Sequence, residues 1–198
     1  MVRPNAPNAN PLRLMTLDRN VSEGNAFTGT AFAEVRFLKD FKFTFNVGAG
    51  VDGRRHTSMN NMYYGQFATN GGTLYKEHEQ KFYVNLQQLL SYDRTFADVH
   101  NLGLLLGHET YRMNNVSVSG YKTNMFSIDN LELGGAVIDG QQAASSRSEY
   151  NNEGFFFRAQ YDYADRIFLS GSYRLDASSR FHKDRRWGSF WSFGAGWL

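Results

Sequence analysis

The adjacent side chains of His108 and Glu109 are of the types that bind zinc or transfer protons. A zinc motif of the HExxH kind needs a second histidine at position 112, where this chain has Arg112. One His and one Glu also fall short of the three or four ligands that zinc takes, so we interpret the pair as part of a polar rim. No Ser-His-Asp arrangement, nucleophile elbow or Gly-rich phosphate loop is indicated. The sequence therefore predicts no catalytic residue, no metal site, no cofactor and no enzyme activity.

Charged residues stand at alternate positions of several short segments and are the candidates for ligand selectivity. They are Glu34, Arg36, Arg158, Asp162, Arg174 and Asp176. Alternate positions of a strand share one face, so we expect these side chains to line a wet, lumen-like surface. Salt bridges between neighbouring strands are the alternative role. The charge-dense stretch 174–186 suits either an anionic ligand or a partner, or is a solvated loop with weak ion pairs.

Four aromatic residues, Tyr63, Tyr64, Phe67 and Tyr75, fall in a segment that we expect to be an exposed loop, 53–79. Aromatic rings stack on the apolar faces of sugars, which makes these residues candidates for contact with a substrate. Packing of the loop against itself is the alternative.

The elements that would position these residues are strands. The apolar residues Phe41, Phe43, Phe45, Val47, Ala49 and Val51 alternate with polar ones. A period of two fits a strand and contradicts a helix. The preceding segment 27–37 shows the same pattern, and Leu38-Lys39-Asp40 links the two as a hairpin. About ten alternating residues are what a tilted strand needs to cross a bilayer, and the charged inner face would be unfavourable in a dry core.

Further alternating segments lie at 81–91, 101–109, 155–163, 167–176 and 191–197. Short turns at 94–98 and 164–166 alternate with long connections at 53–79 and 112–150, an asymmetry that is typical of outer-membrane barrels. Tyr63, Tyr64, Tyr163, Trp187 and Trp197 are candidates for aromatic girdles at the membrane interfaces. The predicted fold is all-β, an antiparallel up-and-down meander of about seven strands that is part of a large transmembrane β-barrel. We expect residues 1–198 to form one partial barrel domain, with a loop at 1–23.

Composition narrows the classes of partner. The 198 residues carry a formal net charge of +2, which is too small to argue for nucleic acid, and there is no Cys for disulfides or thiolate metal sites. The chain contains no run of about 18 apolar residues, so the sequence predicts no membrane-spanning helix. The mean hydropathy of −0.50 does not count against barrel strands, because their apolar residues alternate with polar ones. Met1 is not followed by a secretory signal, so we expect the natural start to lie upstream and the chain to be a fragment.

Several motifs resemble the barrel of SusC/RagA-type TonB-dependent transporters of the Bacteroidetes outer membrane. They are Tyr173 to Phe181, Arg186 to Ser192, Gly194 to Trp197, Leu105 to Glu109, Asp129 to Gly134 and Asn10-Pro11-Leu12. The resemblance covers nearly the whole chain. One departure is Leu175-Asp176-Ala177, where the family usually has Arg-Asp-Gly. The signal peptide, TonB-binding segment and plug domain of the family are not in this chain, and about seven strands are too few for a barrel of roughly 22.

The resemblance implies that the complete protein actively imports oligosaccharides or peptides across the outer membrane of a Gram-negative, Bacteroidetes-like cell. Its implied partners are the remainder of its own barrel and plug, a SusD-like surface lipoprotein as lid, TonB acting through the plug, the glycan or peptide substrate, and outer-membrane lipid. A passive porin-like barrel is the first alternative, and it would lack a plug upstream. A soluble all-β carbohydrate-binding module is the second, and it would fold in water without detergent.

Overall fold

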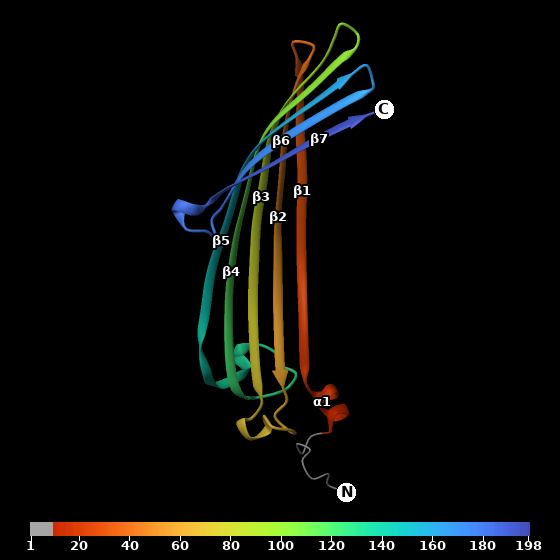
Figure 1. Ribbon diagram of the computed structural model, residues 1–198. Helices are drawn as coiled ribbons and strands as arrows, with labels where there is room; N and C mark the ends of the chain where they lie inside the picture. The colour runs from red at the N-terminus through yellow and green to blue at the C-terminus, as the bar shows by residue number, and fades with distance from the viewer. Residues whose placement is uncertain (1–9) are drawn as a thin grey trace. The chain divides into compact units, whose positions relative to one another are not determined.

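The computed structural model describes residues 10–198, and of residues 139–142 only the backbone. Seven strands form one sheet in which each strand is hydrogen-bonded to its neighbours in sequence (Figure 1). They are β1 (Arg19–Phe37), β2 (Phe41–Asn60), β3 (Thr73–Phe96), β4 (His100–Met125), β5 (Ala136–Tyr163), β6 (Ile167–Ser178) and β7 (Trp187–Trp197). The predicted all-β, up-and-down meander of seven strands is confirmed. Among the described residues no helix is long and apolar enough to cross a membrane.

The contacts divide the chain into two compact units. Unit 1 contains the described part of Met1–Ala26, with Val51–Lys81 and Asn115–Ser148. Unit 2 contains Phe27–Gly50, Phe82–Asn114 and Glu149–Leu198. Strands β1 to β5 contribute residues to both units, whereas β6 and β7 belong to unit 2 alone.

Unit 2 contains the three tight links that join β1 to β2, β3 to β4 and β5 to β6 (Figure 1). In each link the first two residues have a positive φ, between 48° and 61°. They are Leu38 and Lys39, Ala97 and Asp98, and Ala164 and Asp165. Tight hairpins favour a left-handed backbone at such positions, and Asn, Asp or Gly adopts it at the lowest cost. Leucine, lysine and alanine therefore hold a strained conformation at these turns.

Replacing Leu38 by glycine is expected to raise the free energy of unfolding by about 1 kcal/mol, because the left-handed strain disappears. Leu38 is 76% exposed, so little packing is lost with its side chain. The matched control is Ala33→Gly inside β1, where φ is ordinary and glycine should cost about 0.5–1 kcal/mol. Denaturant unfolding of the refolded protein checks both changes, and two shifts of the same sign would contradict the prediction.

The two faces of the sheet in unit 2 differ in chemistry. On one face Arg158 lies opposite Ser172, and Ser172 lies opposite Ser192. On the other face Phe157 lies opposite Tyr173, and Tyr173 lies opposite Trp191, which is 80% exposed. The predicted alternation of polar and apolar residues is thus confirmed in β5, β6 and β7. We call these surfaces the polar face and the apolar face.

Unit 1 holds the buried apolar side chains of the described residues. They are Met59, Leu74, Met125 and Ala136, with Met62, Ile128, Leu131 and Leu133 packed against them. Asn61 is buried beside this cluster and is fully engaged, because its carbonyl oxygen accepts hydrogen bonds from the amides of Tyr63 and Tyr64. The four buried apolar residues of this cluster lie at the ends of β2, β3, β4 and β5, next to the connections 61–72 and 126–135.

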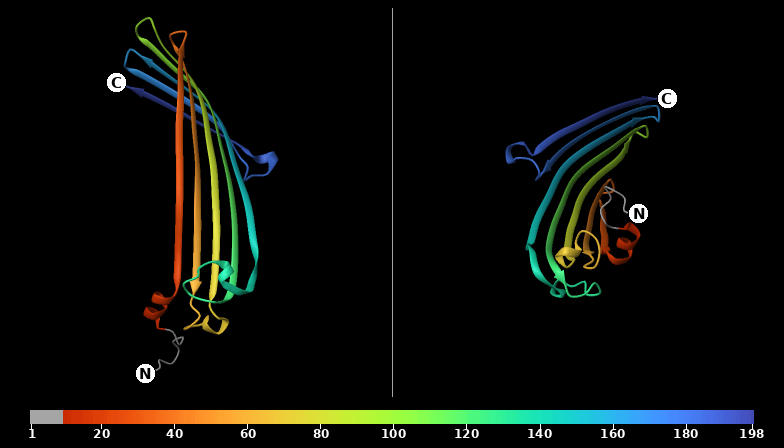
Figure 2. Two further views of the ribbon diagram at one scale, coloured as in Figure 1. Left: turned by 180° about the vertical axis from the view of Figure 1, so that it is seen from behind. Right: turned by 90° about the horizontal axis from the view of Figure 1, so that it is seen from below.

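Helix α1 (Pro11–Leu17) begins with a side-chain cap, since Asn10 accepts a hydrogen bond from the amide of Leu12 at 3.0 Å. Pro11 suits the first turn because it has no N–H to satisfy there. After the helix, one carboxylate oxygen of Asp18 accepts hydrogen bonds from the backbone and side-chain amides of Asn61, at 2.9 and 2.6 Å. These two hydrogen bonds hold the end of α1 against the connection 61–72. Helix α1 lies beside this connection in both views of Figure 2.

The long loops predicted at 1–23, 53–79 and 112–150 are wrong in their extents. Residues 1–9 lie outside the described residues, but α1 and the start of β1 occupy 11–23. The other two connections are only 61–72 and 126–135. Each contains one short turn of 3-10 helix, Ala68–Asn70 in the first and Leu133–Gly135 in the second. The strands continue into unit 1 beyond the predicted alternating segments, because backbone hydrogen bonds to neighbouring strands do not require an apolar face.

Candidate functional site

Arg174 is the centre of the polar face in unit 2. Its Nε atom donates to both carboxylate oxygens of Asp176, at 2.8 and 2.7 Å. One of its terminal nitrogens lies 3.8 Å from a carboxylate oxygen of Glu109 on β4, and its guanidinium lies 5.3 Å from the ring centre of Phe156 on β5. Arg174 therefore connects three neighbouring strands and engages both carboxylates near it.

Two glycines make room for this arrangement. A Cβ atom at Gly107 would overlap the ring of Phe156, and one at Gly154 would overlap the carboxylate of Asp176. Side chains of the polar face thus lie flat across the sheet, over positions that have no side chain of their own. Any larger residue at Gly107 would push Phe156 away from Arg174.

A row of aromatic rings crosses the same face. The hydroxyl of Tyr83 on β3 makes a hydrogen bond of 2.8 Å with Thr28, and its ring lies 6.5 Å from that of Tyr111 on β4. The ring of Tyr111 meets Tyr150 on β5 edge-on at 6.1 Å, and Arg180 lies 4.9 Å above the ring centre of Tyr150. We call Tyr83, Tyr111, Tyr150 and Arg180 the tyrosine–arginine row.

The row borders a hollow in unit 2 that we call the basic hollow. Its charged lining residues are Glu109, Glu153, Arg174, Asp176, Arg180, Arg185 and Arg186, and Tyr111 and Tyr150 supply rings. Arg186 donates from Nε to the carbonyl oxygen of Phe181 at 3.1 Å, which shapes the connection 179–186. Arg180 and Arg185 form no ion pair with any acidic side chain of the described residues. Guanidinium groups and rings together suit a ligand that carries both an anionic group and a flat apolar surface.

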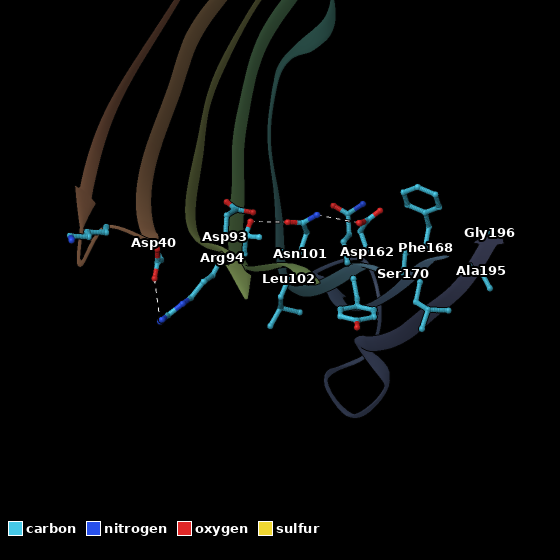
Figure 3. A pocket seen from close by; sticks show the side chains of 17 residues that line it. Asp40, Asp93, Arg94, Asn101, Leu102, Asp162, Phe168, Ser170, Ala195 and Gly196 are labelled. Atoms are coloured by element: carbon cyan, nitrogen blue, oxygen red, sulfur yellow. Dashed lines mark hydrogen bonds and ion pairs between the residues drawn. The ribbon is translucent and has the colours of Figure 1, made fainter. Parts of the chain in front are cut away.

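A second hollow lies beside the tight links and is different in charge (Figure 3). Asn101 connects two other polar side chains that line it. Its amide oxygen accepts a hydrogen bond from the hydroxyl of Thr95 at 2.7 Å, and its amide nitrogen donates one to the carboxylate of Asp162 at 3.1 Å. In Figure 3 Asp93, Asn101 and Asp162 form a row on one side of the strands, and Leu102 points to the other side. Asp40 and Arg94 pair at 3.5 Å at its edge. This acidic hollow suits neutral or cationic polar groups.

The remaining charged candidates are divided between paired and unpaired side chains. Glu34 accepts from the Nε atom of Arg36 at 2.9 Å and lies 3.8 Å from the ammonium of Lys42. Arg158 is exposed on the polar face, and it makes no ion pair within residues 10–198 as described. The structure thus brings together Glu34 with Arg36 in β1 and Arg174 with Asp176 in β6, so each of these pairs lies within one strand. The ion pairs between neighbouring strands are those of Glu34 with Lys42 and of Arg174 with Glu109.

Comparison with known proteins gives relatives over the whole chain, although no protein-family profile matches it. The chain is 27% identical over 202 residues to the TonB-dependent receptor SusC of Bacteroides thetaiotaomicron, which covers 98% of this chain and 19% of that protein. It is 26% identical over 200 residues to the TonB-dependent receptor P3 of Formosa agariphila, covering 95% of this chain and 19% of that protein. The solved structure of the RagAB peptide transporter matches 91% of this chain and 20% of its own, with a TM-score of 0.82 at 19% identity.

The chain is related to the SusC/RagA-type TonB-dependent receptors. Its fold agrees equally well with the RagAB peptide importer in the closed-closed state, at a TM-score of 0.83 and 20% identity. The chain spans about a fifth of the length of the curated relatives it matches. It therefore corresponds to a section of the β-barrel in this fold.

The four aromatic candidates do not form one surface. Tyr64 is engaged within unit 1, because its hydroxyl accepts from the amide of Asn10 at 2.6 Å and Arg13 lies over its ring at 4.9 Å. Tyr75 is in strand β3 and packs 6.0 Å from His56, so its predicted place in a loop is wrong. Phe67 and Tyr63 lie in the connection 61–72, and Tyr63 is 61% exposed.

His108 and Glu109 point to opposite faces of the sheet, because successive residues of a strand alternate. Glu109 belongs to the polar face, as expected, but His108 stacks on Phe155 of the apolar face at 4.5 Å. The imidazole nitrogens lie 2.8 Å from Gln88 and 3.0 Å from Glu153. No group of three or more His, Cys, Asp or Glu in the part of the chain that is described could hold a metal ion.

The tyrosine–arginine row was missed from sequence as a candidate site. Tyr83 falls inside the predicted strand 81–91 without being a candidate there, and Tyr111 and Tyr150 fall outside the predicted strands 101–109 and 155–163. The period of two along a strand could have found them, because alternate residues share one face. Tyr111 is two residues after Glu109, and Tyr150 is six residues before Phe156, so each lies on the same face as that residue.

Proposed function

We propose that this chain is part of the wall of a TonB-dependent importer in the outer membrane of a Bacteroidetes-like cell. Its apolar face in unit 2 would contact lipid and its polar face would line the lumen. The substrate would be an oligosaccharide or a peptide, delivered under a SusD-like surface lipoprotein, and TonB would act through a plug domain. The relatives named above are receptors and transporters, which supports a transport role in place of an enzymatic one.

The observation that carries this proposal is the exposed apolar face of unit 2. Trp191 and Phe193 are 80% and 71% exposed, although a soluble sheet would cover such residues. The strand β7 has 11 residues, and Trp187 and Trp197 are its ends. At about 3.3 Å per residue and a tilt of about 40°, these two rings are about 25 Å apart along the membrane normal, the height of a barrel's apolar band.

Aromatic and polar neighbours at both ends of the apolar face support the same arrangement. His100 packs 5.0 Å from Tyr163 near the tight links, and Phe155 packs 6.1 Å from Trp187 at the other end of the face. Rings with a polar edge are favoured at the level of the lipid headgroups. We assign Tyr163 and Trp197 to one girdle and Trp187 to the other.

Two neighbouring residues of β7 give a direct test, because the chain contains no cysteine. Fluorescent labels on Phe193→Cys and Ser192→Cys would lie on opposite faces. In lipid vesicles we expect brominated lipid to quench the label at position 193 and aqueous iodide to quench the label at position 192. Steady-state fluorescence with each quencher measures this.

Quenching of both labels by iodide alone would contradict the membrane wall and favour a soluble module. Uptake by cells with and without TonB provides the second arm. We expect uptake of the substrate to require TonB, and equal uptake without it would indicate a passive porin.

A further inference from the structure

The basic hollow has more cationic than anionic groups available for a ligand. Arg174 already engages Asp176 and Glu109, at 2.7 and 3.8 Å. Glu153 is bound to His108 at 3.0 Å on the other face. Arg180 and Arg185, which also line this hollow, are left without an acidic partner among the described residues.

Arg180 is held in a geometry that keeps its hydrogen-bond donors available. Its Cζ atom lies 4.9 Å over the centre of the Tyr150 ring, within the range of a cation–π contact. A ring forms no hydrogen bond with the donors in the guanidinium plane, and Arg180 has no acidic partner among the described residues, so these donors are free for a bidentate bond to a carboxylate or sulfate. Tyr150 is itself supported by Tyr111 at 6.1 Å.

The acidic hollow is the natural comparison within unit 2. Asp40, Asp93 and Asp162 line it, and its cations are Lys39 and Arg94, the latter paired with Asp40. An anionic ligand would be repelled there and attracted to the basic hollow. The two hollows thus differ in the ligand charge that they favour.

We infer that Arg180 and Arg185 form a subsite for an anionic group of the substrate, with Tyr150 and Tyr111 as the adjoining ring surface. The inference rests on the proposed function, because it assigns a substrate class to the same transporter. A carboxylate or sulfate on a sugar chain and a carboxylate on a peptide share this chemistry. The substrate is therefore an acidic oligomer.

The test uses the protein extracted in detergent from outer membranes and two matched pairs of probes. One pair is tetragalacturonate and its methyl ester, and the other is a hexapeptide with two glutamates and its glutamine counterpart. We expect the acidic member of at least one pair to bind at least about tenfold more tightly than its neutral partner by isothermal titration calorimetry. The pair that shows the difference identifies a glycan or a peptide as the source of the charge.

Two variants test whether the difference in affinity between acidic and neutral probes arises at Arg180. Arg180→Gln is expected to remove the tenfold difference in affinity between the acidic and the neutral probe. Lys183→Gln is the matched control, since Lys183 is an exposed cation of the same connection that does not line the hollow. The difference should survive in this control.

Equal binding of acidic and neutral probes, no binding of any probe, or a difference that persists in Arg180→Gln would overturn the subsite. An equal loss in Lys183→Gln would also overturn it, because the effect would then be general charge. These results are independent of the fluorescence test at positions 192 and 193. If the subsite fails and the label at Phe193→Cys is quenched by lipid, the transporter proposal stands. If the subsite binds the acidic probe and that label is quenched by iodide alone, the transporter is rejected and only the anion-binding site remains.

Discussion

An arginine at Phe193 is expected to lower the free energy of unfolding of the membrane-inserted protein by about 2–4 kcal/mol. The proposed transporter places this position in the middle of the lipid-facing band, because it lies between Trp187 and Trp197 on the apolar face. A guanidinium there loses its water without gaining a partner. Urea unfolding in lipid vesicles, followed by tryptophan fluorescence, measures the loss.

The control is an arginine at the next residue. Ser192 faces the polar side, where it shares a hydrogen bond of 2.7 Å with Ser172. Ser192→Arg should cost less than about 1 kcal/mol, which is the value of that hydrogen bond. Equal losses at the two positions would reject the assignment of the two faces to lipid and water.

Valine at Gly107 is expected to destabilise the protein by about 1–3 kcal/mol, because its Cβ atom would occupy the place of the Phe156 ring. The ring would have to leave Arg174, so the contact of 5.3 Å between them would be lost as well. Denaturant unfolding of the refolded protein measures the change.

Two further variants separate this clash from a general intolerance of glycine replacement. Gly171 has open space where a side chain would begin, so Gly171→Val should be neutral or slightly stabilising. Adding Phe156→Ala to Gly107→Val should remove the clash, so that the double variant is no less stable than Phe156→Ala alone. A loss at Gly171 as large as that at Gly107 would contradict the explanation.

The part of the fold that could be predicted from sequence is the part where one face is apolar. Phe41 to Val51 alternate strictly, and the structure has a strand there. Beyond Val51 the same strand continues through Gly53, Arg54 and Arg55 to Asn60, with no alternation to reveal it. Hydrogen bonds between backbones hold such strands together, and they leave no trace in the side-chain pattern.

The candidate site was predictable as a face but not as a set of contacts. Parity placed Arg174, Asp176 and Glu109 on one side of the sheet, and the structure adds that they form one ion-pair group. The overlap of Phe156 with Gly107 depends on which residues of β4 and β5 lie beside each other. A single sequence does not contain this register, so the role of the glycines emerged only from the structure.

The order of the strands bears on how the protein is made. Each strand from β2 to β7 pairs with the strand immediately before it, and the described part of the chain contains no crossover between distant strands. A sheet of this kind can be extended from its N-terminal edge as synthesis or insertion proceeds, one strand at a time, and each addition leaves a single growing edge for the next. The outer edge of β1 has no partner within the sheet that the structure describes, so an insertion machinery would have to protect two edges, that of β1 and that of the newest strand.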